Sequence, residues 1–163
     1  MTRYTPLPAS RPALAELPLV ATDRRNPHPT SLATRVAMVG NVGSGTRPEL
    51  ALRRLLTAAG ARGYRLHARV EGIRPDLVWA GRKVAVFVHG CFWHRCPTCR
   101  YPLPKSHRDF WIAKFRRNRA RDRAKRRALE RAGWRVVEVW EHEIANKGVR
   151  AVARVLSALA STA

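Results

Sequence analysis

The sequence has few acidic residues, few cysteines and no long hydrophobic run. Only 11 Asp and Glu residues oppose 32 Lys and Arg residues among 163, which gives a formal net charge of +21 at pH 7. A globular enzyme of small metabolites has no use for such a field, so the expected partner is a polyanion, with nucleic acid first. No segment approaches the roughly 20 apolar residues of a membrane span, and prolines interrupt residues 1–20, where a secretory signal would need an apolar core. We therefore expect a soluble, cytoplasmic and nucleoid-associated protein with no membrane partner.

The three cysteines are concentrated in one short segment. Cys91, Cys96 and Cys99 follow a C-x4-C-x2-C spacing and share the 13 residues 87–99 with two histidines. An odd number of cysteines cannot pair fully within one chain, and their clustering favours a reducing compartment. A tight turn could bring the thiolates to one centre at the roughly 2.3 Å that zinc requires. The spacing therefore predicts metal ligands.

The rest of the chain has the pattern of one α/β domain behind an arm. Residues 1–30 hold six of the eleven prolines, which predicts a disordered or extended arm, and residues 31–163 are expected to form a single domain that begins with a short helix at 31–39. Apolar periodicity and Gly or Pro punctuation predict helices at 46–60, 106–132 and 149–159, and strands at 64–68, 76–80, 83–89 and 134–140. The turn at 80–82 favours a hairpin. The fold class is therefore α/β, with a mixed central sheet flanked by helices.

The long predicted helix is strongly basic. Between Lys114 and Arg131 it carries ten Lys or Arg residues against two acids. Charge runs are usually solvated surfaces, but one-sided charge forms few salt bridges and repels itself, so we favour a face that contacts phosphates. The alanines at 120, 124, 128 and 132 predict a narrow packing face at four-residue spacing.

One acid stands out at the start of a predicted buried strand. Asp76 follows Arg74-Pro75 and precedes an apolar hairpin that ends at His89. A carboxylate at a sheet edge of a basic protein is a good Mg²⁺ ligand, because this metal prefers hard oxygen ligands and a substrate phosphate can complete its shell. Asp76 could equally cap the strand or form a salt bridge.

Several segments together resemble the very-short-patch-repair (Vsr) mismatch endonucleases. The likeness covers about residues 35–145 and rests on Pro75-Asp76, His89-Gly90-Cys91-Phe92-Trp93-His94, Phe110 to Lys114 with Asn118 and Arg121-Asp122, Gly133 to Val136, and Val139 to Glu141. This resemblance implies a restriction-endonuclease-like core. It also implies an enzyme that nicks DNA beside T·G mismatches left by deamination of 5-methylcytosine.

The resemblance also implies catalytic roles. Asp76 matches the Mg²⁺ ligand, assisted by the backbone carbonyl of Val88, and His94 matches the general base that activates water. Asp122 matches an acid that orients this base. Val88 stands where some relatives have Thr or another polar residue, so a carbonyl ligand survives here but a hydroxyl role does not. From the residues alone, His94 could instead be a fourth zinc ligand or a turn histidine.

Two further active-site positions match His89 and Glu49. Glu49 also has a local explanation, because Thr46 and Glu49 have the spacing of a capping box at the start of a helix. For zinc, the fourth ligand that best suits the cysteines is His142, which follows the last predicted strand at a position where the family also places a ligand. Such a closed Cys₃His set is structural in kind.

The resemblance assigns DNA contacts as well. It implies that Phe92, Trp93 and Trp111 wedge into the duplex beside the mismatch while Met38 enters from the other groove. Phe92 and Trp93 lie in a turn, where we expect that they cannot both face a core. The remaining DNA-binding residues that we predict are Lys114, Asn118 and Arg121.

We therefore predict a Mg²⁺-dependent nicking endonuclease that contains a structural Zn²⁺ and acts on double-stranded DNA with a T·G mismatch. A monomer is the simplest expectation, with other repair proteins as further partners. One rival interpretation is a zinc-stabilised DNA-binding module without catalysis. Another is a related nuclease acting on intact duplex sites.

Overall fold

The computed structural model describes residues 44–161. The predicted arm at 1–30 and the short helix at 31–39 lie outside the described residues. The elements, in chain order, are α2 (Arg47–Ala58), β1 (Arg65–Leu66), β2 (Leu77–Trp79), a 3₁₀ turn (Ala80–Arg82), β3 (Val84–His89), α3 (Arg108–Arg131), β4 (Arg135–Trp140), α4 (Glu141–Ala145) and α5 (Val149–Ala160). The predicted elements between 46 and 159 are thereby confirmed, with shorter first and second strands. The short helix α4 was not predicted.

The described strands form one mixed sheet in the order β1-β2-β3-β4. β2 pairs with β3 in antiparallel register, Leu77 opposite Val86, and the 3₁₀ turn closes the predicted hairpin with Lys83 in the left-handed region at φ 48°. β3 pairs with β4 in parallel register, Val84 opposite Arg135. A parallel pair needs a long crossover, and the chain between Gly90 and Trp134 supplies it with α3.

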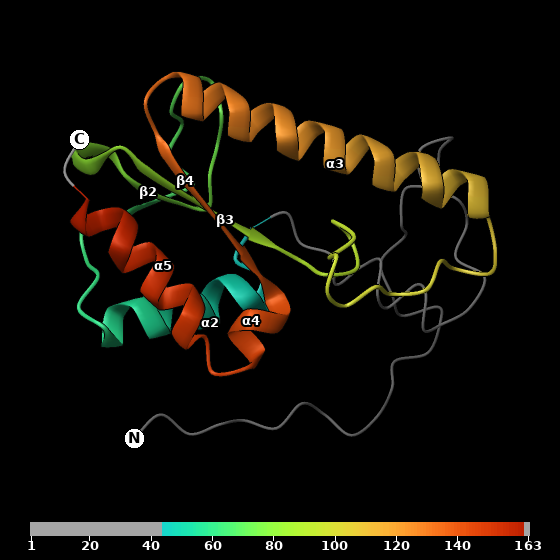
Figure 1. Cartoon of the computed structure of the whole chain (residues 1–163), viewed down its shortest axis with the longest axis horizontal. Coiled ribbons are helices and arrows are strands. Elements are labelled where there is room, and N and C mark those ends of the chain that lie inside the picture. Colours follow the sequence, from blue (N-terminus) through green and yellow to red (C-terminus); the bar gives the residue numbers. More distant parts are fainter. Residues whose placement is uncertain (1–43, 162–163) are drawn as a thin grey trace, which may run out of the picture. The chain divides into compact units, whose positions relative to one another are not determined.

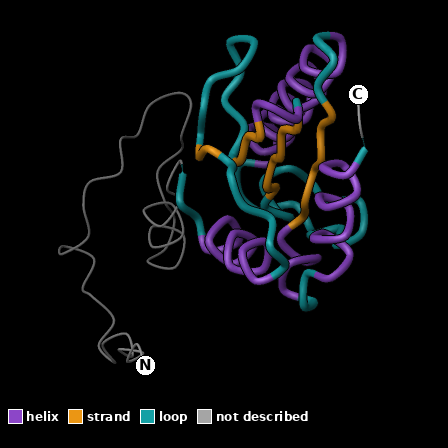
Figure 2. Tube along the Cα trace, turned by 90° about the vertical axis from the view of Figure 1, so that its left-hand side faces the viewer, coloured by secondary structure: helices purple, strands orange, loops and turns teal. Residues whose placement is uncertain are grey.

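Alternate residues of β3 contribute their side chains to two different hydrophobic cores. Val84 and Val86 face one core, which α2, α4 and α5 cover. Ala85 and Phe87 face the other, smaller core, to which α3 contributes Leu129. Figures 1 and 2 show α3 on one side of the sheet and the shorter helices on the other. The period of two along the strand therefore yields a sheet covered on both faces.

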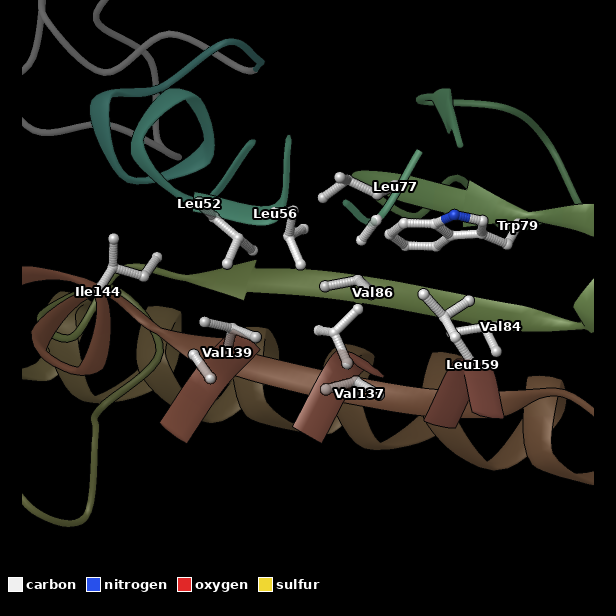
Figure 3. Packing of buried hydrophobic residues seen from close by; sticks show 13 residues of the cluster. Leu52, Leu56, Leu77, Trp79, Val84, Val86, Val137, Val139, Ile144 and Leu159 are labelled. Atoms are coloured by element: carbon white, nitrogen blue, oxygen red, sulfur yellow. The ribbon is translucent and has the colours of Figure 1, made fainter. Parts of the chain in front are cut away.

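The larger core is built mainly from aliphatic side chains of α2, α5 and the strands. Leu52 and Leu56 of α2 lie one turn apart and are fully buried over β3, and Leu159 of α5 closes the core near Val84 (Figure 3). Burial of each such leucine contributes roughly 1.5–3 kcal/mol. This packing fixes the start of α2, and with it Glu49, against the sheet.

The packing face of α3 differs from the one predicted. Ala120 and Ala124 are exposed, so the alanine face predicted at 120–132 is wrong for the middle of the helix. The buried residues are Trp111, Phe115 and Leu129. In its middle the helix faces a loop rather than a hydrophobic core, and polar residues replace apolar ones on its inner face there.

Candidate active site

The candidate catalytic residues gather at one edge of the sheet. β3 ends at His89, and Asp76 directly precedes β2. Because β2 runs antiparallel to β3, the beginning of β2 lies beside the end of β3. The loop 90–99 continues from this edge and delivers His94.

Asp76 is held by the backbone of β3. Its N–H donates to the Val86 carbonyl at 3.0 Å, and its Oδ2 accepts the Val88 N–H at 2.7 Å. The N–H and C=O of one strand residue point to the same side, so the Val88 carbonyl also faces Asp76. Burial, with help from the Glu49 carboxylate, raises the pKa of Asp76 against the opposing effects of Val88, His67 and His89. A half-buried pair of acids of this kind favours a nearby cation.

A second acid and a histidine lie beside Asp76. Nε2 of His67 is 3.6 Å from Oε2 of Glu49, and Nδ1 of His67 is 3.8 Å from Oδ1 of Asp76. One ligand atom from each of the three residues lies within 4.8 Å of the others. Glu49 also accepts hydrogen bonds from the Thr46 hydroxyl at 2.8 Å and the Gly45 N–H at 2.9 Å. The capping box predicted for Thr46 and Glu49 does not form, because no side chain caps the backbone at the start of α2. Glu49 instead binds the residues just before the helix and lies in the site.

His94 and Asp122 form a dyad between the loop and α3. Nδ1 of His94 is 2.5 Å from Oδ2 of Asp122. Burial alone would raise the pKa of Asp122, but the hydrogen bond and charge of His94, aided by His89 and Lys125, outweigh it and lower the pKa. An ionised Asp122 accepts the proton on Nδ1 and leaves Nε2 of His94 as the basic nitrogen.

His89 connects the two groups. Its side chain is 6% exposed, its ring centroid lies 4.4 Å from that of His94, and its charge acts on both Asp76 and Asp122. Nε2 of His89 lies 3.4 Å from Oε1 of Glu138 on β4. The hydrogen bond from His89 is the main cause that lowers the pKa of Glu138, with burial opposing it.

Glu138 has a second partner on α3. NH1 of Arg126 donates to Oε2 of Glu138 at 3.3 Å. Arg126 on α3 thus holds the Glu138 side chain in place, and Glu138 on β4 in turn holds the ring of His89. Two histidine–carboxylate pairs stand side by side in the site.

The cysteines converge with a histidine of α4. Sγ of Cys91 and Sγ of Cys96 lie 3.3 Å and 3.5 Å from Nδ1 of His142, and Cys99 completes a set whose ligand atoms lie within 4.8 Å of one another. Tetrahedral bonds of about 2.3 Å to sulfur and about 2.05 Å to nitrogen separate the two atoms by roughly 3.6 Å. Burial raises the pKa of Cys91 to about 12, so its thiolate needs a cation close by. The residues present fit a tetrahedral zinc.

An aromatic cluster lies between the loop and the start of α3. Phe92 contacts Trp93 at a centroid distance of 5.0 Å, Trp111 at 5.8 Å and Phe115 at 5.3 Å. Phe92 and Trp93 share this cluster, but both are only partly buried and neither belongs to the two hydrophobic cores, as expected. Nζ of Lys114 lies 5.5 Å from the Trp93 ring centroid and similarly close to two other rings.

Two predicted DNA-binding residues fasten the loop to α3. Nδ2 of Asn118 donates to the Trp93 carbonyl at 3.1 Å, and NH2 of Arg121 donates to Oδ1 of Asn118 at 2.9 Å. Next to them, a groove of about 330 Å³ is lined by arginines around an apolar floor: Arg95, Leu103, Ile112, Phe115, Arg116, Arg119 and Arg123. This groove carries the charge that a phosphate backbone requires.

Comparison with known proteins identifies the family. The family model described as DNA mismatch endonuclease Vsr matches residues 30–100. The type II nicking enzyme V.NaeI of Lentzea aerocolonigenes is 44% identical over 135 residues, which cover 80% of each chain. The chain belongs to the Vsr family of DNA endonucleases. Another relative is the DNA mismatch endonuclease Vsr of Escherichia coli, 38% identical over 59% of this chain and 61% of that protein. The type II nicking enzyme V.XorIIP of Xanthomonas oryzae is 48% identical over 63% of this chain and 75% of that protein.

Membership of the Vsr family makes the protein a hydrolase that cleaves DNA, connects it with DNA repair and implies dependence on a divalent metal. A solved structure, the catalytic domain of homing endonuclease I-Bth0305I, matches with a TM-score of 0.47 and 19% identity, over 72% of this chain and all of that one. Within residues 44–161, no helix has the length and apolar character needed to cross a membrane.

The structure brings most of the predicted Vsr site together. The catalytic set Asp76, His89, His94, Glu49 and Asp122 meets at one edge of the sheet, and the predicted zinc set meets beside it. Met38 lies outside the described residues.

Sequence reasoning missed two members of the site, His67 and Glu138. Glu138 left a signal, since it is a charge within an otherwise apolar predicted strand. His67 left none, because only its pairing with the start of β2 brings it to the site.

Proposed function

We propose that this Vsr-family endonuclease depends on Mg²⁺ and nicks the strand that carries T at T·G mismatches arising from deamination of 5-methylcytosine. The observation that carries the proposal is the His94–Asp122 dyad, which lies at the same sheet edge as Asp76. Relatives whose names describe nicking enzymes and a mismatch endonuclease support a single-strand cut at a mismatch. We expect the enzyme to act in the cytoplasm as a monomer, with other repair proteins as further partners.

The residues near Asp76 suit a hard cation. Oδ2 of Asp76 is occupied by the Val88 N–H, which leaves Oδ1 and the Val88 carbonyl as oxygen ligands for Mg²⁺. A bound cation would neutralise charge on the scissile phosphate. The raised pKa of Asp76 supports this role, because a bound cation would offset the burial that disfavours the ionised carboxylate.

His94 is the proposed general base. Asp122 holds the proton on Nδ1, so Nε2 can accept the proton of the attacking water. As His94 becomes positively charged, Asp122 stabilises it at a distance of 2.5 Å. His89, held by Glu138, keeps the neighbouring ring in place.

The aromatic cluster is the proposed mismatch reader. Insertion of Phe92, Trp93 and Trp111 into a duplex would cost on the order of a few kcal/mol per unstacked step, and a mismatched pair lowers that cost. In the described structure Trp111 is only 8% exposed. Insertion therefore requires the rings to exchange their mutual contacts for contacts with bases. Lys114, Asn118, Arg121 and, outside the described residues, Met38 complete the proposed DNA-binding set.

A structural zinc is proposed at Cys91, Cys96, Cys99 and His142. This site would clamp the loop that carries His94 to α4, directly after β4. The bound zinc would thereby keep His94, the proposed general base, beside Asp122.

The test is strand cleavage of an end-labelled duplex with one T·G mismatch, in Mg²⁺, beside its T·A twin. Wild type should nick the T strand of the mismatched duplex and leave the twin intact, and Asp76→Ala should cut neither. A matched control is Asp109→Ala, which removes an exposed acid of α3 outside the proposed catalytic and metal-binding sets. Binding without cleavage on any duplex would favour the zinc-stabilised binding module. Equal cutting of the T·A twin would favour a nuclease of intact sites.

A further inference from the structure

His67 is the one histidine of the site that neither the dyad nor Glu138 uses. Its ring lies between the Glu49 and Asp76 carboxylates, with its side chain 18% exposed. Its backbone is anchored on both sides: its N–H donates to the Asp76 carbonyl at 3.1 Å, and its carbonyl accepts from Nε of Arg74 at 2.9 Å. The ring is therefore held beside the proposed metal carboxylate.

We propose that His67 is a nitrogen ligand of the divalent cation held by Glu49 and Asp76, so that the site binds Mn²⁺ more tightly than Mg²⁺. The inference rests on the proposed function, because it takes Asp76 as the metal carboxylate. It adds a nitrogen ligand to the oxygens of Asp76 and Val88, and with it a stronger preference for Mn²⁺.

The distances within the trio fit a shared cation better than hydrogen bonds. The nitrogen–oxygen separations of 3.6 Å and 3.8 Å exceed those of hydrogen bonds. Ligand atoms with bonds of about 2.1 Å to one ion are separated by roughly 3.0 Å at a right angle and roughly 4.2 Å when opposed. Each observed distance falls between these limits, but the two start from different ring nitrogens, and an imidazole binds one ion through only one of them. With one ligand atom taken from each residue, the three atoms still lie within 4.8 Å of one another.

Hydrogen bonds hold the two carboxylates in place beside His67. Oδ2 of Asp76 accepts the Val88 N–H, whereas in Glu49 Oε1 accepts the Thr46 hydroxyl and Oε2 accepts the Gly45 N–H. Oδ1 of Asp76 and Oε2 of Glu49 are the oxygens nearest to His67. Hydrogen bonds from the surrounding chain thus fix both carboxylates with one oxygen of each toward the imidazole. Oδ1 of Asp76 can bind the ion there, and Oε2 of Glu49 can do so through the lone pair that the Gly45 N–H does not use.

The ligand type sets the metal preference. Two carboxylates and one imidazole combine hard oxygen with a nitrogen that Mg²⁺ rarely accepts, whereas Mn²⁺ takes both. Other divalent transition metals would also bind, but thiolates at the cysteine site compete for them. Mn²⁺ is therefore the probe of choice.

The experiment measures metal binding by zinc-loaded, DNA-free protein, without any cleavage assay. Titration of Mn²⁺, followed through the electron paramagnetic resonance signal of the free ion, gives its affinity, and competition gives that of Mg²⁺. Electron spin echo modulation of bound Mn²⁺ reports a directly bonded ¹⁴N. The variants are His67→Gln, His94→Gln as the control for the neighbouring imidazole, and His107→Gln as an exposed control.

Wild type should bind Mn²⁺ at least about tenfold more tightly than Mg²⁺ and show ¹⁴N modulation. His67→Gln should lose the modulation and weaken Mn²⁺ binding by about tenfold or more, with Mg²⁺ affinity changed less than about threefold. Both controls should keep the wild-type signal, and unchanged zinc content and melting temperature would show that the variant folds.

Bound Mn²⁺ without ¹⁴N modulation, or modulation that persists in His67→Gln, overturns the assignment of His67 and leaves the proposed nuclease intact. Loss of the modulation in His94→Gln instead would move the ion to the dyad and overturn it as well. If Asp76→Ala binds Mn²⁺ as wild type does, the proposed metal site itself fails, together with this inference.

Discussion

Replacement of Asp122 by Asn is the sharpest test of the catalytic dyad. Oδ2 of Asp122 lies 2.5 Å from Nδ1 of His94 and fixes the proton there. Asparagine keeps the size of the side chain but loses its charge, and its amide can donate to Nδ1. The histidine proton would then sit on Nε2, the atom that must accept one from water. The variant therefore keeps the fold and loses the base.

The expected loss of nicking rate in Asp122→Asn follows from the role of His94 as the general base. A positioned general base contributes about 10²- to 10⁴-fold, which corresponds to about 3–5 kcal/mol of activation free energy. Nicking by Asp122→Asn should slow by that factor. DNA affinity should change by less than about threefold, or under about 0.7 kcal/mol, because Asp122 faces His94 rather than the exposed basic surface of α3.

The assay is single-turnover nicking of the T·G duplex with enzyme in excess, from about pH 6 to about pH 9, where histidine bases titrate. Asp109→Asn, an exposed acid in the first turn of the same helix, should cleave as wild type does. The double variant Asp122→Asn with His94→Gln should be little slower than His94→Gln alone, since residues acting as a unit are not additive. A rate for Asp122→Asn within about threefold of wild type would refute the dyad.

Three other predictions concern the metal carboxylate, the zinc and the wedge. Asp76→Asn should increase the free energy of unfolding at pH 7 in buffer without divalent cations. Burial raises the pKa of Asp76 in the folded protein, so its ionisation weakens the fold as the pH rises through that pKa. The gain in thermal melts should therefore disappear as the pH falls to the ordinary aspartate pKa of 3.8. Cys96→Ser should lower zinc from about one per chain and reduce the melting temperature, whereas Thr98→Ser, between two cysteines, should change neither. Trp93→Ala should strongly weaken nicking at T·G while zinc content stays intact, and an unchanged nicking rate would exclude the wedge.

Much of the fold could be predicted because local pattern and tertiary structure agree. β3 is a short apolar run bounded by a Gly-containing turn and by Gly90. α2 has a proline as its second residue and buries one leucine per turn. Such signals lie within a few residues of one another. α4 has only five residues, which is too few for any periodicity to emerge. It forms where Glu143 accepts the Trp140 N–H at 2.8 Å, and that hydrogen bond is visible only in the structure.

The residues of the candidate site also fall into two groups, those that the sequence could indicate and those that only the tertiary structure brings to the site. His89, Cys91 and His94 stand within six residues, so their spacing alone marked the site. His67 reaches it through a pairing of its backbone with Asp76, and Glu138 through the parallel register of β4 with β3. Tertiary pairings of this kind leave no periodic trace in the sequence. The family resemblance supplied Asp122, which spacing could not have linked to His94.

The wrong prediction for α3 has a physical reason that bears on catalysis. Along its inner face the helix reads Trp111, Phe115, Asn118, Asp122 and Leu129, steps of three, four or seven residues that keep one side of a helix. Apolar contacts hold both ends, through the aromatic cluster and through Leu129 in the smaller core. The middle gives up apolar burial so that Asn118 can bind the Trp93 carbonyl and Asp122 can bind His94. A continuous apolar stripe would pack better, but it would leave the base without its carboxylate. Ala120 and Ala124 therefore face solvent, and α3 spans the site from one anchored end to the other.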